Sequence, residues 1–176
     1  MLPISTGFKY LGLFIKPLGY RSKDWLWLVQ KFEKKISLWT HKLLSLGGRL
    51  VLVQSVLSSV PVYWMGLAPL PISILHKLRS ITFDFLWGSS GNTHKYHLAC
   101  WSDLSWPKKF EGWGIKNLHW FNIALRLRNF WKVLFSDSLW HRVLIAKYLK
   151  QTTIITWLRE KKFSTRGVSA IWRGFI

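Results

Sequence analysis

A long run without charged residues, positions 50–75, most constrains what this chain can fold into. A run of this length could cross a bilayer, so a membrane span has to be weighed against a pair of buried helices. Pro61, Pro69 and Pro71 interrupt the run, and Gln54 and several serines dilute it. Because proline breaks the hydrogen-bond ladder of a helix, two buried helices with a bend explain the run better than one span. No transmembrane segment is therefore expected.

Around this run, apolar residues recur at steps of three and four, which is the period of an amphipathic helix. A first helix is expected with Asp24 or Ser22 as its cap, and a second with Ser45 as its cap and Pro61 as its break. A third helix follows the proline-rich connector, and helices resume at Leu118. The expected apolar faces are Trp25, Leu28, Val29, Phe32, Ile36, Trp39 and Leu43; Leu50, Val53, Val56, Leu57 and Val60; Ile74, Leu78, Ile81, Phe85 and Leu86; and Phe121, Ala124, Leu125, Leu127, Trp131 and Leu134.

Two other segments lack the helical period. Residues 8–15 form an aromatic and β-branched run before a turn at 16–19, which predicts a strand. Residues 101–114 are rich in Trp and Gly and predict an irregular connector. Gly47 and Gly48 lack the flanking residues of a phosphate-binding loop, so a tight turn or a close helix packing is expected there. The sequence thus predicts a mainly α chain.

Charge indicates the partner. The chain has 26 Lys and Arg against 7 Asp and Glu, a formal net charge of +19, which attracts polyanions. Nucleic acid is the default partner, although an anionic membrane surface or an acidic protein would satisfy the same charge. The candidate contact residues lie off the apolar faces; they are Lys31, Lys34, Lys35, Lys42, Arg49, Arg126, Arg128 and Lys132. Four of these lysines, namely Lys31, Lys34, Lys35 and Lys42, belong to the first expected helix. The alternative interpretation is that they only face water.

Aromatic residues have two interpretations as well. The chain contains 13 Trp, and most of them fall on apolar helix faces, where core packing explains them. Exposed rings could stack on nucleic-acid bases, and Trp27 and Trp113 are the candidates for that role.

The acidic residues do not form a catalytic set. Polymerase chemistry needs clustered carboxylates that hold two metal ions, whereas the seven acids here are scattered along the sequence. Asp24, Asp103 and Asp137 precede or begin expected helices, where a carboxylate satisfies free backbone N–H groups. No catalytic residue is assigned.

His94, His97 and Cys100 could suggest a zinc site, but their spacing is unconventional and a fourth ligand would have to come from a distant residue. No metal and no other cofactor is expected. With a single cysteine the chain can form no internal disulfide, which fits a reducing compartment. The sequence does not choose between the nucleus and an organelle.

Several short blocks in a fixed order carry a resemblance to a known family. They are Tyr10-Leu11-Gly12, residues 39–65 (WTHKLLSLGGRLVLVQSVLSSVPVYWM), 85–88 (FLWG), 97–101 (HLACW), 107–115 (PKKFEGWGI), 122–125 (NIAL) and 139–148 (LWHRVLIAKY). With these blocks the chain resembles the C-terminal, thumb and connection part of reverse transcriptases of plant LINE-type non-LTR retrotransposons, or a related organellar open reading frame.

The resemblance implies a fold and a role. Residues 1–20 would be a palm-edge β remnant near the primer, carrying Tyr10, Leu11 and Gly12; residues 21–90 would be a thumb-like helical bundle that holds the template-primer duplex. Residues 91–117 would be the irregular connector, and 118–176 a C-terminal helical segment. The partner would be an RNA or DNA duplex bound without regard to sequence, and the missing palm could be supplied by another chain.

The resemblance also implies an absence. In the family, the palm with its Asp-Asp turn and Mg²⁺ site lies upstream of the position of Tyr10, and a Cys/His-rich zinc-binding region follows residues 169–173. The chain is therefore expected to be truncated at both ends. Because the palm site is missing, it is not expected to be an enzyme as it stands. The family usually has Gly-Gly-Leu-Gly at positions 111–114, so that connector is expected to pack differently here. The alternatives are a decayed element remnant without a selected function and a basic membrane-surface or protein-interaction module.

Overall fold

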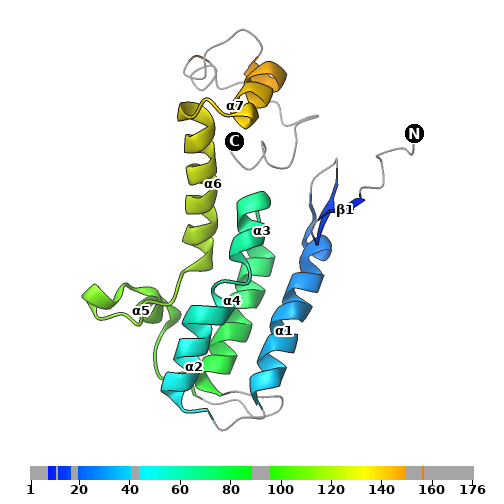
Figure 1. Cartoon of the computed structure of the whole chain (residues 1–176). Helices are drawn as coiled ribbons and strands as arrows, with labels where there is room; N and C mark the ends of the chain where they lie inside the picture. The colour runs from blue at the N-terminus through cyan, green and yellow to red at the C-terminus, as the bar shows by residue number, and fades with distance from the viewer. Residues whose placement is uncertain are drawn as a thin grey trace. The chain divides into compact units, whose positions relative to one another are not determined.

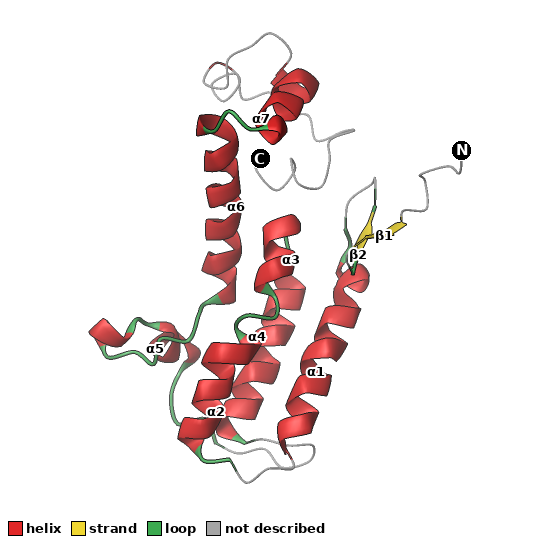
Figure 2. Cartoon of the chain, viewed as in Figure 1, coloured by secondary structure: helices red, strands yellow, loops and turns green. Residues whose placement is uncertain are grey.

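The computed structural model describes residues 8–10, 12–16, 20–40, 44–88, 96–149 and 156, and these are mainly helical (Figure 2). The predicted mainly α class is confirmed. The chain divides into two compact units, one of residues 20–122 and one of residues 1–19 with 123–176. The domain boundaries expected from the sequence stay a prediction.

The first unit is a bundle of helices in which α4 contacts both α1 and α2 (Figure 1). Its elements are η2 (Ser22–Trp25), α1 (Leu26–Thr40), α2 (Leu46–Leu52), η3 (Val53–Leu57), α3 (Val62–Leu67), α4 (Ile72–Trp87), α5 (Trp101–Ser105), η4 (Lys108–Phe110) and the start of α6 (Leu118–Phe135).

The core of this unit lies where the inner faces of these helices meet. Leu28 and Phe32 of α1 and Leu78 and Leu86 of α4 are at most 1% exposed, as their helical spacing predicts. Each such side chain contributes about 1.5–3 kcal/mol to the free energy of unfolding through burial alone. His76, Lys77 and Arg79 of α4 are exposed.

The helix starts were only partly predicted. Ser45 caps α2, because its hydroxyl oxygen accepts a hydrogen bond from Gly48 N at 3.3 Å, as expected. The prediction that Ser22 or Asp24 caps the first helix is wrong. A 3-10 turn, η2, precedes α1, and the N-cap residue of that turn is Arg21. Asp24 supports that cap from inside the turn, where its carboxylate accepts a hydrogen bond from Arg21 N at 2.9 Å.

The uncharged run is interrupted, as predicted, but its first helix is not buried as expected, because α2 contains no buried residue. α2 continues into the π-helical turn η3, and Pro61 then begins α3. By length and composition, Leu46–Leu67 could cross a membrane, but core helices of soluble proteins pass the same test. The Gln54 side chain of this stretch donates a hydrogen bond to Trp113 O at 2.5 Å.

The expected role of the two glycines at the start of α2 is wrong. Gly47 and Gly48 lie within the helix and form no tight turn. Apart from its chain neighbours and the backbone of its own helix, no described atom lies within 4 Å of a Cβ built on Gly47, so no neighbouring helix approaches it closely.

The connector is more ordered than its sequence predicts. It contains α5 and η4, and its later part is tied back by hydrogen bonds from Gly114 N to Trp106 O at 2.9 Å and from Ile115 N to Leu104 O at 3.1 Å. Leu104 and Ile115 are almost fully buried and anchor the loop. This order could not be predicted from the sequence, because the contacts join positions without any regular period.

One residue of this connector is strained. Glu111 has φ = 64°, and within the described residues it is the one non-glycine with a positive φ. This left-handed conformation costs a residue with a Cβ about 1–2 kcal/mol. Glycine adopts this conformation without that cost, so the strain follows from the presence of a side chain at position 111.

Replacing Glu111 with glycine is therefore expected to raise the free energy of unfolding by about 1 kcal/mol, since the relief of strain exceeds the added freedom of the unfolded chain. Urea denaturation measures the change. Glu111→Ala is the matched control, because alanine keeps the Cβ and should give no such gain. Equal stability of the two variants would contradict this explanation.

The second unit contains a β-hairpin, the later part of α6, α7 (Leu139–Leu144) and η5 (Ile145–Leu149). The predicted single strand over residues 8–15 is wrong. β1 (Phe8–Tyr10) and β2 (Leu13–Ile15) pair antiparallel, with Phe8 opposite Ile15. Gly12 allows the reversal because its φ is 81°. Ser138 caps α7, because its hydroxyl oxygen accepts a hydrogen bond from His141 N at 3.2 Å.

The outer surface of α6 departs from the prediction. Leu127 and Trp131 were expected on a buried face, yet they are 61% and 64% exposed, and Phe135 is 69% exposed. These three residues are one face of the helix by their spacing, and we call them the α6 apolar stripe. The ring centroids of Trp131 and Phe135 lie 4.3 Å apart. Periodicity identified the face but not whether anything covers it.

Candidate nucleic-acid interface

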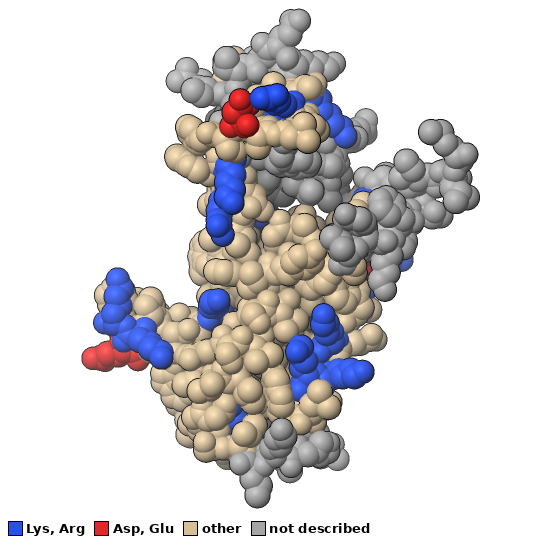
Figure 3. Space-filling view, in the orientation of Figure 1, with Lys and Arg blue, Asp and Glu red and all other residues tan. Residues whose placement is uncertain are grey.

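The strongest candidate contact surface is the outward side of α1. Lys31 and Lys34 are exposed and Lys35 is half-buried. Their spacing of three and four residues puts them on one side of the helix, away from buried Leu28 and Phe32. Figure 3 shows basic side chains gathered where α1 runs in Figure 1. We call Lys31, Lys34 and Lys35 the α1 lysine face.

The α1 lysine face is a net cationic surface, because Glu33 is the one acidic residue within α1. Glu33 is itself exposed. Lys42, predicted as a fourth contact residue, lies outside the described residues.

Arg49, another predicted contact residue, packs against the C-terminal end of α4. Its guanidinium lies against Gly88, the left-handed residue that ends α4, and a Cβ built on Gly88 would overlap it. A cation at this place is favoured by the carbonyl groups at the helix C-terminus. Contact of Arg49 with nucleic acid stays a prediction, and its position supplies a structural reason for an arginine here.

The predicted basic residues of α6 do not share one face. Arg128 and Lys132 are four residues apart and exposed, so they lie together beside the α6 apolar stripe. Arg126 lies on another side of the helix and is half-buried, and burial lowers its pKa below the ordinary value of an arginine. The structure thus brings together two of the three.

The palm-edge residues lie at the β-hairpin. Tyr10 ends β1 opposite Leu13, and Gly12 forms the turn. Leu11 lies outside the described residues. Their predicted role near a primer stays a prediction.

The rings predicted to stack on bases already have ring neighbours. Trp27 packs edge-on against Trp64 with centroids 4.8 Å apart, and Trp113 lies 5.9 Å from Trp87. The more exposed indoles are those of Trp106, Trp120 and Trp131, at 55%, 66% and 64%. No sequence signal separated them from the packed ones, because helical spacing alone places most tryptophans on apolar faces.

Among the described residues, the acids remain dispersed in three dimensions. The Asp84 carboxylate lies 3.7 Å from His97, and that of Asp137 lies 3.2 Å from Arg142. Throughout the described part of the chain, no group of three or more His, Cys, Asp or Glu could hold a metal ion. Cys100 is exposed and His94 lies outside the described residues, so the expected absence of zinc stays a prediction.

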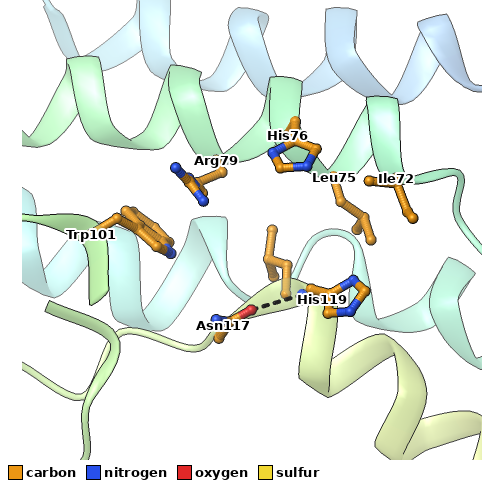
Figure 4. Close-up of a pocket in the computed structure, with 8 residues that line it drawn as sticks. Ile72, Leu75, His76, Arg79, Trp101, Asn117 and His119 are labelled. Carbon is orange, nitrogen blue, oxygen red and sulfur yellow. Dashed lines mark hydrogen bonds between the residues drawn. The ribbon is translucent and has the colours of Figure 1, made fainter. Parts of the chain in front are cut away.

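A cavity of about 270 Å³ opens between α4 and the start of α6 (Figure 4). Its lining residues come from within the first unit: Ile72, Leu75, His76, Arg79, Trp101, Asn117, Leu118 and His119. Helical spacing puts His76 and Arg79 on the outer side of α4, but no pattern in the sequence indicates that His119 of another helix lies beside them.

Comparison with known proteins gives two relatives, both from Arabidopsis thaliana. The chain is 40% identical over 122 residues to one named "Putative ribonuclease H protein", covering 69% of this chain and 20% of that protein. It is 29% identical over 120 residues to one named "Uncharacterized mitochondrial protein", covering 67% of this chain and 75% of that protein. The chain thus spans about a fifth of the first relative's length. No family model and no solved structure matches the chain.

Proposed function

We propose that the chain is the thumb and connection segment of a plant LINE-type reverse transcriptase and holds a template-primer duplex. The observation that carries this proposal is the exposed α1 lysine face on a helix whose opposite side is buried in a bundle. The net charge of +19 supports a polyanionic partner. One plant relative, of which the chain covers 20%, is named "Putative ribonuclease H protein", and a nuclease name agrees with a nucleic-acid partner.

Contact would be made with phosphates and not with bases. A lysine ammonium is a compact charge on a flexible stem, so it can meet a phosphate without the planar fit that reads a base edge. Binding would therefore orient and retain a duplex of any sequence.

A salt titration tests the proposal. Fluorescence anisotropy with labelled RNA–DNA and DNA duplexes should show affinity falling steeply between about 50 and 200 mM salt, because bound counterions are released when phosphates are neutralised. Two duplexes of unrelated sequence should give similar slopes. A folded chain that does not bind, as a decayed remnant without a selected function would behave, contradicts the proposal.

We further propose that the chain does not extend a primer by itself. Phosphoryl transfer by two metals needs clustered carboxylates, and within the described residues the acids are dispersed. Primer extension with Mg²⁺ or Mn²⁺ should show no template-directed incorporation. Incorporation that is lost in Asp84→Asn or Asp103→Asn would overturn this expectation.

One observation favours a second candidate, a basic membrane-surface module. Within the apolar stretch Leu46–Leu67, the side chains of Leu46, Val51 and Tyr63 are 42%, 61% and 51% exposed. Vesicles of anionic and of neutral phospholipid separate the candidates. Cosedimentation with anionic vesicles that a duplex cannot displace would favour the membrane; displacement by duplex would favour nucleic acid.

A further inference from the structure

The cavity between α4 and the start of α6 is lined by one arginine and two histidine side chains from two helices. His76 and Arg79 are three residues apart on α4, which puts them on one face, and His119 comes from the first turn of α6 (Figure 4). Asn117 fixes this turn, since its side-chain oxygen accepts a hydrogen bond from His119 N at 3.1 Å. Residues far apart in the sequence thus share one small concave site.

The electrostatics of this cavity suit an anion. Among the described residues that line it there is no Asp or Glu, and no described carboxylate forms an ion pair with Arg79. The guanidinium of Arg79 lies over the Trp101 ring at 5.8 Å from its centroid, and that contact holds it at the cavity wall. An arginine fixed in this way presents a planar fork that matches the oxygens of a phosphate.

The remaining wall is apolar. Leu75 and Leu118 are buried behind the cavity, and Ile72, 60% exposed, lies at its edge. A bare inorganic anion would leave this apolar wall wet, whereas a flat ring carried beside the phosphate would cover it. The wider hollow next to it shares Arg79 and Trp101 but includes the carboxylate of Asp103, which disfavours an anion there.

We propose that this cavity binds the phosphate monoester of a single nucleotide, with the phosphate on Arg79, His76 and His119 and the base on the apolar wall. The site lies apart from the α1 lysine face in its residues and takes a different ligand, so the inference stands without the proposed duplex binding. The nucleotide could be free or could be the 5′-phosphorylated end of a single strand, since both present the same group.

Isothermal titration of the full chain with adenosine 5′-monophosphate tests the site, with adenosine and inorganic phosphate as comparison ligands. Adenosine monophosphate should bind at least about tenfold more tightly than either, because only it engages both the Arg79 and histidine side chains and the apolar wall. Arg79→Gln should weaken its binding about tenfold or more, through loss of charge-assisted hydrogen bonds.

Lys77→Gln is the matched control, because Lys77 is an exposed cation of the same helix that does not line the cavity. It should change the affinity less than twofold or so by screening alone. Circular dichroism checks that each variant is folded. Equal affinities of Arg79→Gln and Lys77→Gln, or equal affinities for adenosine and its monophosphate, would overturn the proposal.

Two further arms separate the sources and the sites. A 5′-phosphorylated oligonucleotide that binds more tightly than its 5′-hydroxyl form, with the advantage lost in Arg79→Gln, identifies the strand end as the ligand. Equal binding of the two forms, with adenosine monophosphate still bound, identifies the free nucleotide. The variant lacking the α1 lysine face should keep its affinity for adenosine monophosphate, so failure of one proposal is distinguishable from failure of the other.

Discussion

Replacing Lys31, Lys34 and Lys35 together with alanine is expected to lower the magnitude of the log–log salt slope of duplex binding by about two to three units. Each lysine that neutralises a phosphate releases close to one counterion, so three lost contacts remove close to three counterions. At about 0.1 M salt the affinity should fall by about two orders of magnitude. Anisotropy with a labelled duplex over a range of salt concentrations measures both quantities.

The fold should survive this triple substitution, because Lys31 and Lys34 are exposed and the buried face of α1 is unchanged. A second triple variant, Lys108→Ala with Lys109→Ala and Lys116→Ala, removes the same charge from exposed positions on the connector and beyond it. If binding depends only on net charge, both variants lose the same slope. If the α1 lysine face holds the duplex, only the first does, and an unchanged slope in the first variant assigns its lysines to a merely solvated surface.

Gly112→Ala should destabilise the first unit strongly, by about 3 kcal/mol. A Cβ at this position would overlap the carbonyl group of Trp106, and a backbone group cannot swing aside as a side-chain end can. Relief of the overlap would pull apart the hydrogen bonds from Gly112 N to Pro107 O at 3.3 Å and from Gly114 N to Trp106 O at 2.9 Å. The midpoint of urea denaturation measures the loss.

Gly47→Ala provides the matched control for this substitution. Gly47 lies within α2, and apart from its chain neighbours and the backbone of this helix no described atom is within 4 Å of the added methyl group. Alanine is the better helix former, so this variant should be stabilised by about 0.5–1 kcal/mol. A Gly112→Ala variant as stable as the wild-type chain would show that the connector accommodates a side chain without strain.

The inner helices could be predicted from the sequence because burial imposes a period. The spacing of Leu28 and Phe32 in α1 and of Leu78 and Leu86 in α4 is enough to place them inward, whatever they pack against. The same spacing misled at Trp131, because period shows which residues share a face and not whether another element covers it.

Chain turns, and contacts between residues far apart in the sequence, could not be predicted in the same way. The hairpin depends on one left-handed glycine, Gly12, inside a run that otherwise favours a strand. At the candidate duplex surface, Lys31 and Lys34 were correctly expected on the outside, since an unpaired charge is costly to bury. The cavity combines Arg79 with His119, and only the packing of two distant segments brings them together.

The α6 apolar stripe affects how the isolated chain behaves in solution. Leu127, Trp131 and Phe135 form an exposed hydrophobic patch, and patches of this kind promote self-association. Mutual repulsion between molecules of charge +19 opposes such clustering at low ionic strength. Added salt screens this repulsion but does not remove the hydrophobic patches. The solubility of the chain should therefore decline as the salt concentration rises. Dilute samples are therefore needed to separate true release of nucleic acid from loss of protein into aggregates.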